Sequence, residues 1–259
     1  FSMIIAAFVL VVGLISPKHL RFRAALFVAG CILLVLANYR TSILAILPMA
    51  AMFMYTAMSA RIESRYKPVF AVCAISGLVL AFMVFSYAMQ DRFADVFVFF
   101  SSWQDLVKAP MYYTEKEKDI FSARVYLWSQ YIYAFANADW INQLIGMGPE
   151  SWNGVFKKYA HNTYVSFLYE YGLVGLITFL IAVTSFLVYA LKITNRMFAW
   201  TLFASMVGFL IMNFATMPLW NIEGLILYAI LVGNTIAPTR LTENGSVKSP
   251  VVFSHYASE

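Results

Sequence analysis

The sequence predicts an all-α, polytopic membrane protein. Of its 259 residues, 62% are hydrophobic and only 12% are charged, whereas soluble domains carry about a quarter charged residues. Apolar runs of membrane-spanning length recur along the chain. These runs are continuous and do not alternate with a period of two, which favours helices over a barrel. We therefore expect a bundle of transmembrane helices.

Seven apolar stretches are the candidate spans. They cover residues 3–15, 22–38, 43–60, 69–89, 163–191, 200–217 and 222–236. The predicted organisation is four spans over residues 1–89, one large helical loop over 90–162, three spans over 163–237 and a tail over 238–259. The chain opens at Phe1, inside an apolar run and without a basic flank, so we expect earlier spans in a longer protein.

Basic residues indicate the orientation of these spans. They gather in the short loops after the first, third and fifth spans: Lys18, Arg21 and Arg23; Arg61, Arg65 and Lys67; Lys192 and Arg196. Counting spans places these loops and the C-terminal tail on one side, which the positive-inside rule makes cytoplasmic. The large loop then lies on the opposite, non-cytoplasmic face of the membrane. The net charge of +5 reports this topology and does not indicate nucleic-acid binding.

The loop 90–162 is rich in aromatic residues, among them Trp103, Trp128, Trp140 and Trp152. Disordered segments are poor in such residues, so we expect a folded loop. Residues 91–107 and 121–136 are predicted to form amphipathic helices at the headgroup level. Two interpretations remain open: interfacial helices that pack over the bundle, or a lid that closes over a site at the membrane surface.

The candidate general base is His161, at the end of the loop. It directly precedes the fifth span, where Asn162 or Thr163 is expected to cap the helix. A helix N-terminus suits an anion, and its dipole disfavours the imidazolium, which leaves a neutral ring able to accept a proton near pH 7. Gly172 and Gly175 are expected to let a neighbouring helix approach closely. A structural or interfacial role for the histidine is the competing interpretation.

Arginines are the candidate anion-binding groups. Arg40 lies at the outer end of two predicted spans, where an arginine is costly and usually faces a cavity or a partner. Its planar fork fits a phosphate. Snorkelling to lipid headgroups is the alternative. Arg124 and Arg92, both in the large loop, are further candidates of the same kind.

Carboxylates in the predicted spans are the remaining suspects. Glu170 falls two turns into the fifth span, and Glu223 lies near the outer end of the seventh. Both are costly in lipid and therefore candidates for function, although Glu170 could equally bind a loop group or an arginine. The sequence has no zinc-type spacing of His, Cys and carboxylates, no Walker loop and no dinucleotide fingerprint. We expect no metal and no cofactor.

Together these residues resemble the superfamily of O-antigen ligases and O-antigen polymerases, and most closely the ligases. Its members carry the pattern H-[NSQ]-x9-G-x-x-G at the end of a large periplasmic loop. The similarity covers roughly residues 24–221. The residues that carry it are the motif residues His161, Asn162, Gly172 and Gly175; the upstream pair Gly146 and Gly148; the helix start Tyr39-Arg40-Thr41-Ser42; and Arg124 followed by Trp128.

The resemblance implies a GT-C-like glycosyltransferase bundle whose N-terminal part is missing. It implies a metal-independent, inverting transfer of a glycan from undecaprenyl pyrophosphate to a lipid A–core sugar hydroxyl, a step of lipopolysaccharide biosynthesis. Arg40 and Arg124 would hold the pyrophosphate, and His161 would take the proton of the acceptor hydroxyl. Supporting candidates are Asn162, Glu170, Arg92 and Tyr39. The implied partners are the lipid-linked donor, the acceptor and membrane lipids, with no nucleic acid.

Other functions remain open at this point. O-antigen polymerases and protein O-oligosaccharyltransferases resemble ligases in their loops and donors, and the Arg-Thr-Ser helix start at residue 40 favours a ligase. A transporter of lipid-linked glycans would instead have polar residues at mid-bilayer and broken helices. Asn213 and Pro48 are the candidates for such features.

Overall fold

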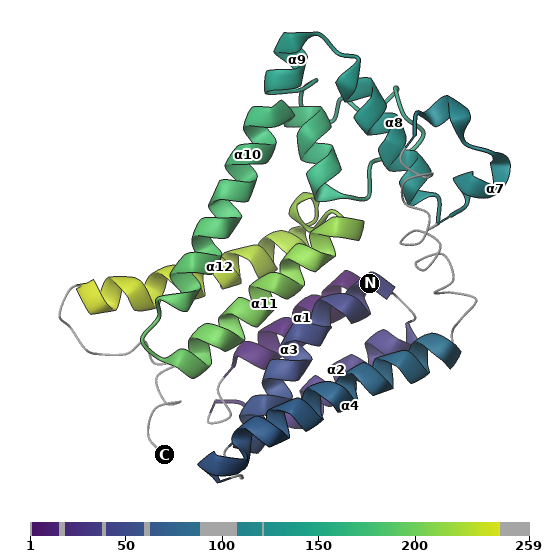
Figure 1. The fold of residues 1–259 in the computed structure, drawn as a ribbon. Coiled ribbons are helices and arrows are strands. Elements are labelled where there is room, and N and C mark those ends of the chain that lie inside the picture. Colours follow the sequence, from purple (N-terminus) through teal and green to yellow (C-terminus); the bar gives the residue numbers. More distant parts are fainter. Residues whose placement is uncertain are drawn as a thin grey trace. The chain divides into compact units, whose positions relative to one another are not determined.

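The structure is a computed structural model of the chain, and it describes residues 2–15, 19–37, 40–59, 63–88, 108–120 and 122–243 (Figure 1). Every regular element within these ranges is a helix. The chain divides into two compact units. The first comprises Phe1–Gly77, Ala182–Asn213 and Met217–Glu259, and the second comprises Leu78–Ile181 and Phe214–Thr216.

Long helices stand at the places of all seven predicted spans. They are α1 (Ser2–Leu14), α2 (Arg23–Leu36), α3 (Arg40–Ser59), α4 (Lys67–Ala88), α10 (Thr163–Leu191), α11 (Arg196–Ala215) and α12 (Ile222–Glu243). Two short 3-10 turns, η1 (Ser64–Tyr66) and η3 (Pro218–Trp220), precede α4 and α12. Two of these helices, α10 and α11, are long and apolar enough to cross a membrane, with mean hydropathies of 2.3 and 1.7 in their best windows. The seven-span count stays a prediction.

In the first unit, α1 packs against α2, α3 and α12. Gly208 of α11 lies against the α3 backbone, because a Cβ at this position would come within 2.4 Å of the Ala45 carbonyl oxygen. A glycine here allows the two backbones to approach closely. Leu202, Met206 and Phe209 complete the buried face of α11.

Arg23 differs from its predicted place in a loop. It is the first residue of α2 and is buried. Its Nε and Nη2 atoms donate to the carbonyl oxygens of Val12 and Gly13, at 3.2 and 2.5 Å, in the last turn of α1. Its guanidinium also lies 4.7 Å from the ring centroid of Phe53. Arg23 therefore caps the C-terminus of α1, where carbonyl groups lack helical partners.

The second unit contains η2 (Pro110–Tyr112), α7 (Glu115–Lys118), α8 (Arg124–Ala136) and α9 (Trp140–Ile145). Helix α8 falls within the predicted helix 121–136, and the predicted helix 91–107 lies outside the described residues. η2, α7 and α9 all pack against α8. The helices of the large loop thus pack into a folded structure, as its aromatic content predicts. The side of the membrane on which it lies stays a prediction.

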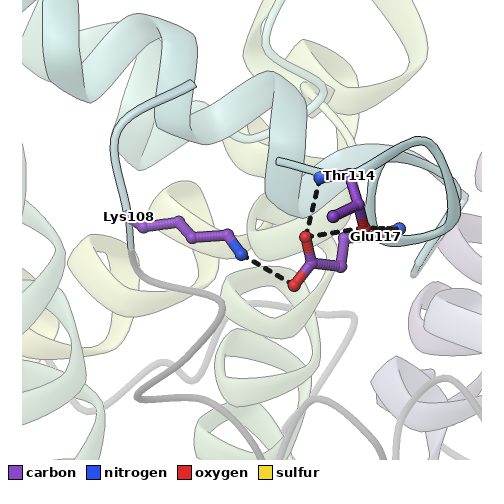
Figure 2. Close-up of polar contacts among 3 residues, drawn as sticks. All are labelled: Lys108, Thr114 and Glu117. Carbon is purple, nitrogen blue, oxygen red and sulfur yellow. Dashed lines mark hydrogen bonds and ion pairs between the residues drawn. The ribbon is translucent and has the colours of Figure 1, made fainter. Parts of the chain in front are cut away.

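A polar cluster fixes the start of α7 (Figure 2). The Thr114 hydroxyl caps the helix, and the Glu117 carboxylate accepts from the Thr114 amide at 2.7 Å. Lys108 donates to the same carboxylate at 2.7 Å. Lys108 and then Thr114 lower the pKa of Glu117 to about 2. These bonds tie Lys108 to the start of α7. Tyr113, between them in the chain, contacts the ring of Tyr126 on α8.

Helix α10 departs from the single straight span predicted for residues 163–191. Gly172 has φ 67° and ψ −166°, which interrupts the helix. The Phe167 and Phe179 rings stack at 4.6 Å between centroids, whereas in a straight helix they would lie about 18 Å apart along the axis. The first arm, residues 163–171, therefore folds back on the second arm, residues 173–191, with Gly172 at the apex (Figure 1).

Candidate active site

A pocket of about 560 Å³ opens in the second unit between the N-terminus of α8 and the segment that leads into α10. Among the described residues that line it, four are basic or can be protonated and none is acidic. The pocket therefore attracts anions. It is lined by Ser122, Ala123, Arg124, Tyr126, Leu127, Gln130, Val155, Phe156, Lys157, Lys158 and His161.

His161 is a partly buried member of this pocket. Burial first, and then the charges of Arg124 and Lys158, lower its pKa below the ordinary value of 6.5. This direction agrees with the prediction from the sequence. However, burial and the two cations lower the pKa of His161, whereas the prediction had assigned the effect to the helix dipole. The ring of Tyr159 lies 3.9 Å from the imidazole, centroid to centroid. His161 is therefore neutral at pH 7 and able to accept a proton.

The backbone around the pocket is strained. Among the described residues, the non-glycine residues with a positive φ are Ser122, Ala123, Glu150 and His161. Three of the four line the pocket. A left-handed conformation costs about 1–2 kcal/mol per non-glycine residue and persists only where the surroundings hold it in place. Strain of this kind clusters at functional sites, which makes the pocket a candidate active site.

Aromatic residues of α8 hold the His161 segment in place. The indole nitrogen of Trp128 donates to the Ala160 carbonyl at 2.9 Å, and the Tyr131 hydroxyl donates to the Lys158 carbonyl at 2.9 Å. Tyr131 also stacks on Phe156, with ring centroids 4.1 Å apart. Through these bonds the helix that carries Arg124 fixes the backbone on both sides of Tyr159, immediately before His161.

Two helix N-termini flank the pocket. The Asn162 side chain accepts from the amides of Tyr164 and Val165, at 2.9 and 3.1 Å, which confirms it as the cap of α10. At the start of α8 the cap position is Ala123, which offers no side-chain hydrogen bond. Ser122, Ala123 and Arg124, at the start of α8, line the pocket. The N-terminal end of a helix carries a partial positive charge, which adds to that of the arginine.

Glu170 holds the Gly146–Ser151 loop onto α10. Its carboxylate is fully buried and accepts from the Glu150 amide at 2.9 Å and from the Ser166 hydroxyl. Its backbone carbonyl accepts from the Gly148 amide, also at 2.9 Å. Of the two roles that the sequence left open, the geometry shows the loop contact. Because a carboxylate with these partners is committed to the scaffold, we assign Glu170 a structural role.

The motif glycines allow the loop to touch the bend in α10. A Cβ on Gly146 would lie 2.2 Å from the Glu170 carbonyl oxygen, and one on Gly172 would lie 2.4 Å from the Leu144 carbonyl oxygen. Both have positive φ, of 84° and 67°. The expected close approach of a neighbouring helix is therefore confirmed at Gly172, which lies against Leu144 of α9 and against Gly146, the residue that follows α9. At Gly175 the crowding atom is Cβ of Tyr171, in the same bent helix.

The other predicted site residues are not brought to this pocket by the described structure. Arg40 is the partly buried first residue of α3, in the first unit. Glu223 lies in the first turn of α12, in the same unit. Tyr39 and Arg92 lie outside the described residues. Within the part of the chain that is described, no group of three or more His, Cys, Asp or Glu residues could hold a metal ion.

Lys157 and Lys158 are pocket residues that were not predicted from the sequence. Both side chains are exposed at the pocket, but a pair of lysines in a loop usually indicates only a solvated surface. The signal was their position three and four residues before His161, because a cation that close along the chain can act on the imidazole. Tyr159, two residues before His161, was not predicted from the sequence either.

We expect Lys158→Gln to raise the pKa of His161 toward 6.5, because it removes one of the two charges that lower it. The measurement is an NMR titration of the labelled histidine rings in nanodiscs; the chain has three His residues, so loss of one signal in His161→Gln assigns the peak. Lys157→Gln is the matched control, since the charges that lower the pKa of His161 are those of Arg124 and Lys158 and not that of Lys157. Equal shifts in the two lysine variants would contradict this electrostatic account.

The sequence model of a family described as O-antigen ligase matches residues 24–180, more than half of the chain. The match includes Arg40, Arg124, His161 and the motif glycines. No curated protein and no solved structure matches the chain. On the family match, this chain belongs to the O-antigen ligase family.

Proposed function

We propose that this protein transfers a glycan from undecaprenyl pyrophosphate to a sugar hydroxyl of lipid A–core, at the periplasmic surface of a bacterial inner membrane. The family implies lipid-linked glycan substrates and a membrane setting. The observation that carries the proposal is the pocket itself, which groups a neutral His161 with the cations Arg124 and Lys158 and has no acidic residue among the described residues that line it. A base beside a cationic cradle suits a reaction in which a hydroxyl attacks and a diphosphate leaves.

The reaction is an inverting displacement at the anomeric carbon. The acceptor hydroxyl oxygen forms the new bond to that carbon as the bond to the phosphate oxygen breaks. His161 takes the hydroxyl proton, and undecaprenyl pyrophosphate leaves with the bonding electron pair. The negative charge that grows on the leaving group is stabilised by the Arg124 guanidinium and by the amides at the start of α8. These groups supply the positive charge, so the proposed reaction needs no metal.

Arg40 is the second proposed ligand of the pyrophosphate. The support for it is its position at the first residue of α3, in a chain whose family acts on lipid-linked glycans. An arginine at a helix start can offer two parallel N–H bonds together with the free amides of the first turn.

Lipid A–core is the proposed acceptor because the helix start at Arg40 resembles that of ligases. A second lipid-linked glycan would make the protein a polymerase, and a pilin-like protein would make it a protein O-oligosaccharyltransferase. All three reactions use the same donor chemistry and the same base. Supplying the three acceptors separately to the reconstituted protein, with one common donor, distinguishes them by which product forms.

We expect Arg124→Lys to weaken donor use by about tenfold or more, because a point charge replaces a two-pronged hydrogen bond. Arg40→Lys should have an effect in the same direction. The measurement is the KM for the lipid-linked donor in nanodiscs, with the acceptor saturating. Arg65→Lys is the matched control, because Arg65 is exposed in η1. If Arg124→Lys keeps the wild-type KM and kcat, Arg124 does not hold the pyrophosphate.

A further inference from the structure

Helix α9 has the reverse of the polarity expected for a helix on a water-facing surface. Trp140, Ile141, Leu144 and Ile145 are all exposed, with Trp140 at 69% and Ile145 at 62%. The polar Gln143 turns toward the protein instead, and its amide nitrogen donates to the carbonyl oxygens of Ala136 and Ala138, each at 3.1 Å. In water, burial would favour the opposite arrangement.

The exposed face of α9 continues onto the second arm of α10. The Leu144 carbonyl and the Gly146 amide lie directly against Gly172, at the apex of the bend. The next two residues of α10, Leu173 and Val174, are exposed and apolar. Figure 1 shows α9 beside this end of α10. The exposed side chains of α9 and the start of the second arm therefore form one apolar belt, made of Trp140, Ile141, Leu144, Ile145, Leu173 and Val174.

The second arm indicates what covers this belt. Residues 173–191 span about 28 Å at 1.5 Å per residue, close to the thickness of a bilayer's hydrocarbon core. Only 17% of the most apolar window of α10 is buried inside the protein, compared with 61% for α11. Lipid is the solvent in which such an exposed apolar helix is stable. The arm begins at Gly172, so the apex lies at a bilayer surface, and α9 lies at the same height.

We propose that α9 is a membrane-interface helix whose Trp140, Ile141, Leu144 and Ile145 side chains insert among the lipids at the bilayer surface where the second arm of α10 enters. Tryptophan concentrates at this depth because its ring is apolar and its N–H is polar. The inward turn of Gln143 keeps this polar side chain out of the hydrocarbon. The proposal rests on the membrane crossing of α10 but not on the transfer chemistry.

Insertion of α9 sets the height of the active site. The first arm of α10 joins the two: Gly172 at its upper end touches α9, and Asn162 caps its other end beside His161. The arm is about 13 Å long at 1.5 Å per residue. The pocket is thereby held at a fixed distance from α9.

Spin-label accessibility tests the insertion directly. Nitroxides are placed at Ile141→Cys, Ile145→Cys and, as the water-facing control, Glu115→Cys, whose side chain is 90% exposed. Each is introduced into the full chain with Cys31→Ala and Cys73→Ala, because both native cysteines are free thiols. The protein is reconstituted at one copy per nanodisc of phosphatidylethanolamine and phosphatidylglycerol. Collisions with apolar O2 and with the water-soluble complex NiEDDA are then measured.

We expect the ratio of O2 to NiEDDA accessibility to be several-fold higher at positions 141 and 145 than at 115. Adding Ile145→Asp should lower the ratio at position 141, because a carboxylate draws the helix out of the lipid. A ratio at 145 equal to that at 115 would place α9 in water and overturn the proposal. Low access to both reagents would show that protein covers the belt, which also overturns it. None of these readings depends on transfer activity, so they stand apart from a failure of the proposed function.

Discussion

His161→Ala is expected to lower the rate of glycan transfer by about a hundred- to ten-thousand-fold, the usual contribution of a general base. The imidazole has a lowered pKa and lines a pocket with Arg124 and Lys158, so its loss removes the proposed proton acceptor while leaving the cationic groups in place. The measurement is kcat for transfer by the purified protein in nanodiscs, with donor and acceptor both saturating.

The control for this change is His19→Ala. His19 is exposed and precedes α2 in the first unit, so its loss should leave the rate unchanged. Membrane insertion and thermal stability are compared across the three proteins. Neither variant removes the left-handed backbone conformation at residue 161. If His161→Ala retains more than a small fraction of the rate, another group removes the proton.

Gly172→Ala is expected to produce the second large effect, a loss of both stability and activity. A methyl group at this apex would meet the Leu144 carbonyl oxygen at 2.4 Å, and the φ of 67° disfavours any side chain. The left-handed conformation alone costs about 1–2 kcal/mol, and the displaced backbone adds to that cost. The loop would shift away from Glu170, and the first arm of α10, which positions Asn162, would lose its upper support.

The measurement is the midpoint of thermal unfolding in detergent, together with the transfer rate. Gly233→Ala in α12 is the matched control, because its added Cβ meets nothing within 4 Å and alanine favours a helix. We expect the control to be neutral or slightly stabilising. A midpoint for Gly172→Ala that equals the wild type would mean that the bend in α10 does not depend on the glycine.

The positions of the long helices could be predicted from the sequence, whereas the bend within α10 could not. Continuous apolar runs identified the positions of the seven long helices, and the spacing of Asn162 ahead of an apolar run identified the cap of α10. The fold-back at Gly172 was not predicted, because the run 163–191 has no proline and reads as one uninterrupted helix. The bend depends on the end of α9, an element from elsewhere in the chain that packs on the glycine, which local pattern does not record.

Only part of the candidate site could be predicted from the sequence. His161, Arg124 and the glycine motif could be found, since each lies in a recognisable local pattern. That Arg124 and His161 line one pocket depends on Trp128 and Tyr131, whose bonds to the Ala160 and Lys158 carbonyls cross about 30 residues of chain. Side-chain bonds to a distant backbone leave no periodic trace in a sequence. The joint action of Arg40 with these residues stays a prediction.

The most direct test of the proposed transfer is reconstitution with an undecaprenyl-pyrophosphate-linked glycan and lipid A–core, in the presence of EDTA. We expect the glycan to appear on lipid A–core, with one undecaprenyl pyrophosphate released for each glycan transferred, and we expect neither product with His161→Ala. Movement of the donor across the bilayer with its glycan still attached to the pyrophosphate, and no transfer to any acceptor, would contradict the account and indicate a transporter.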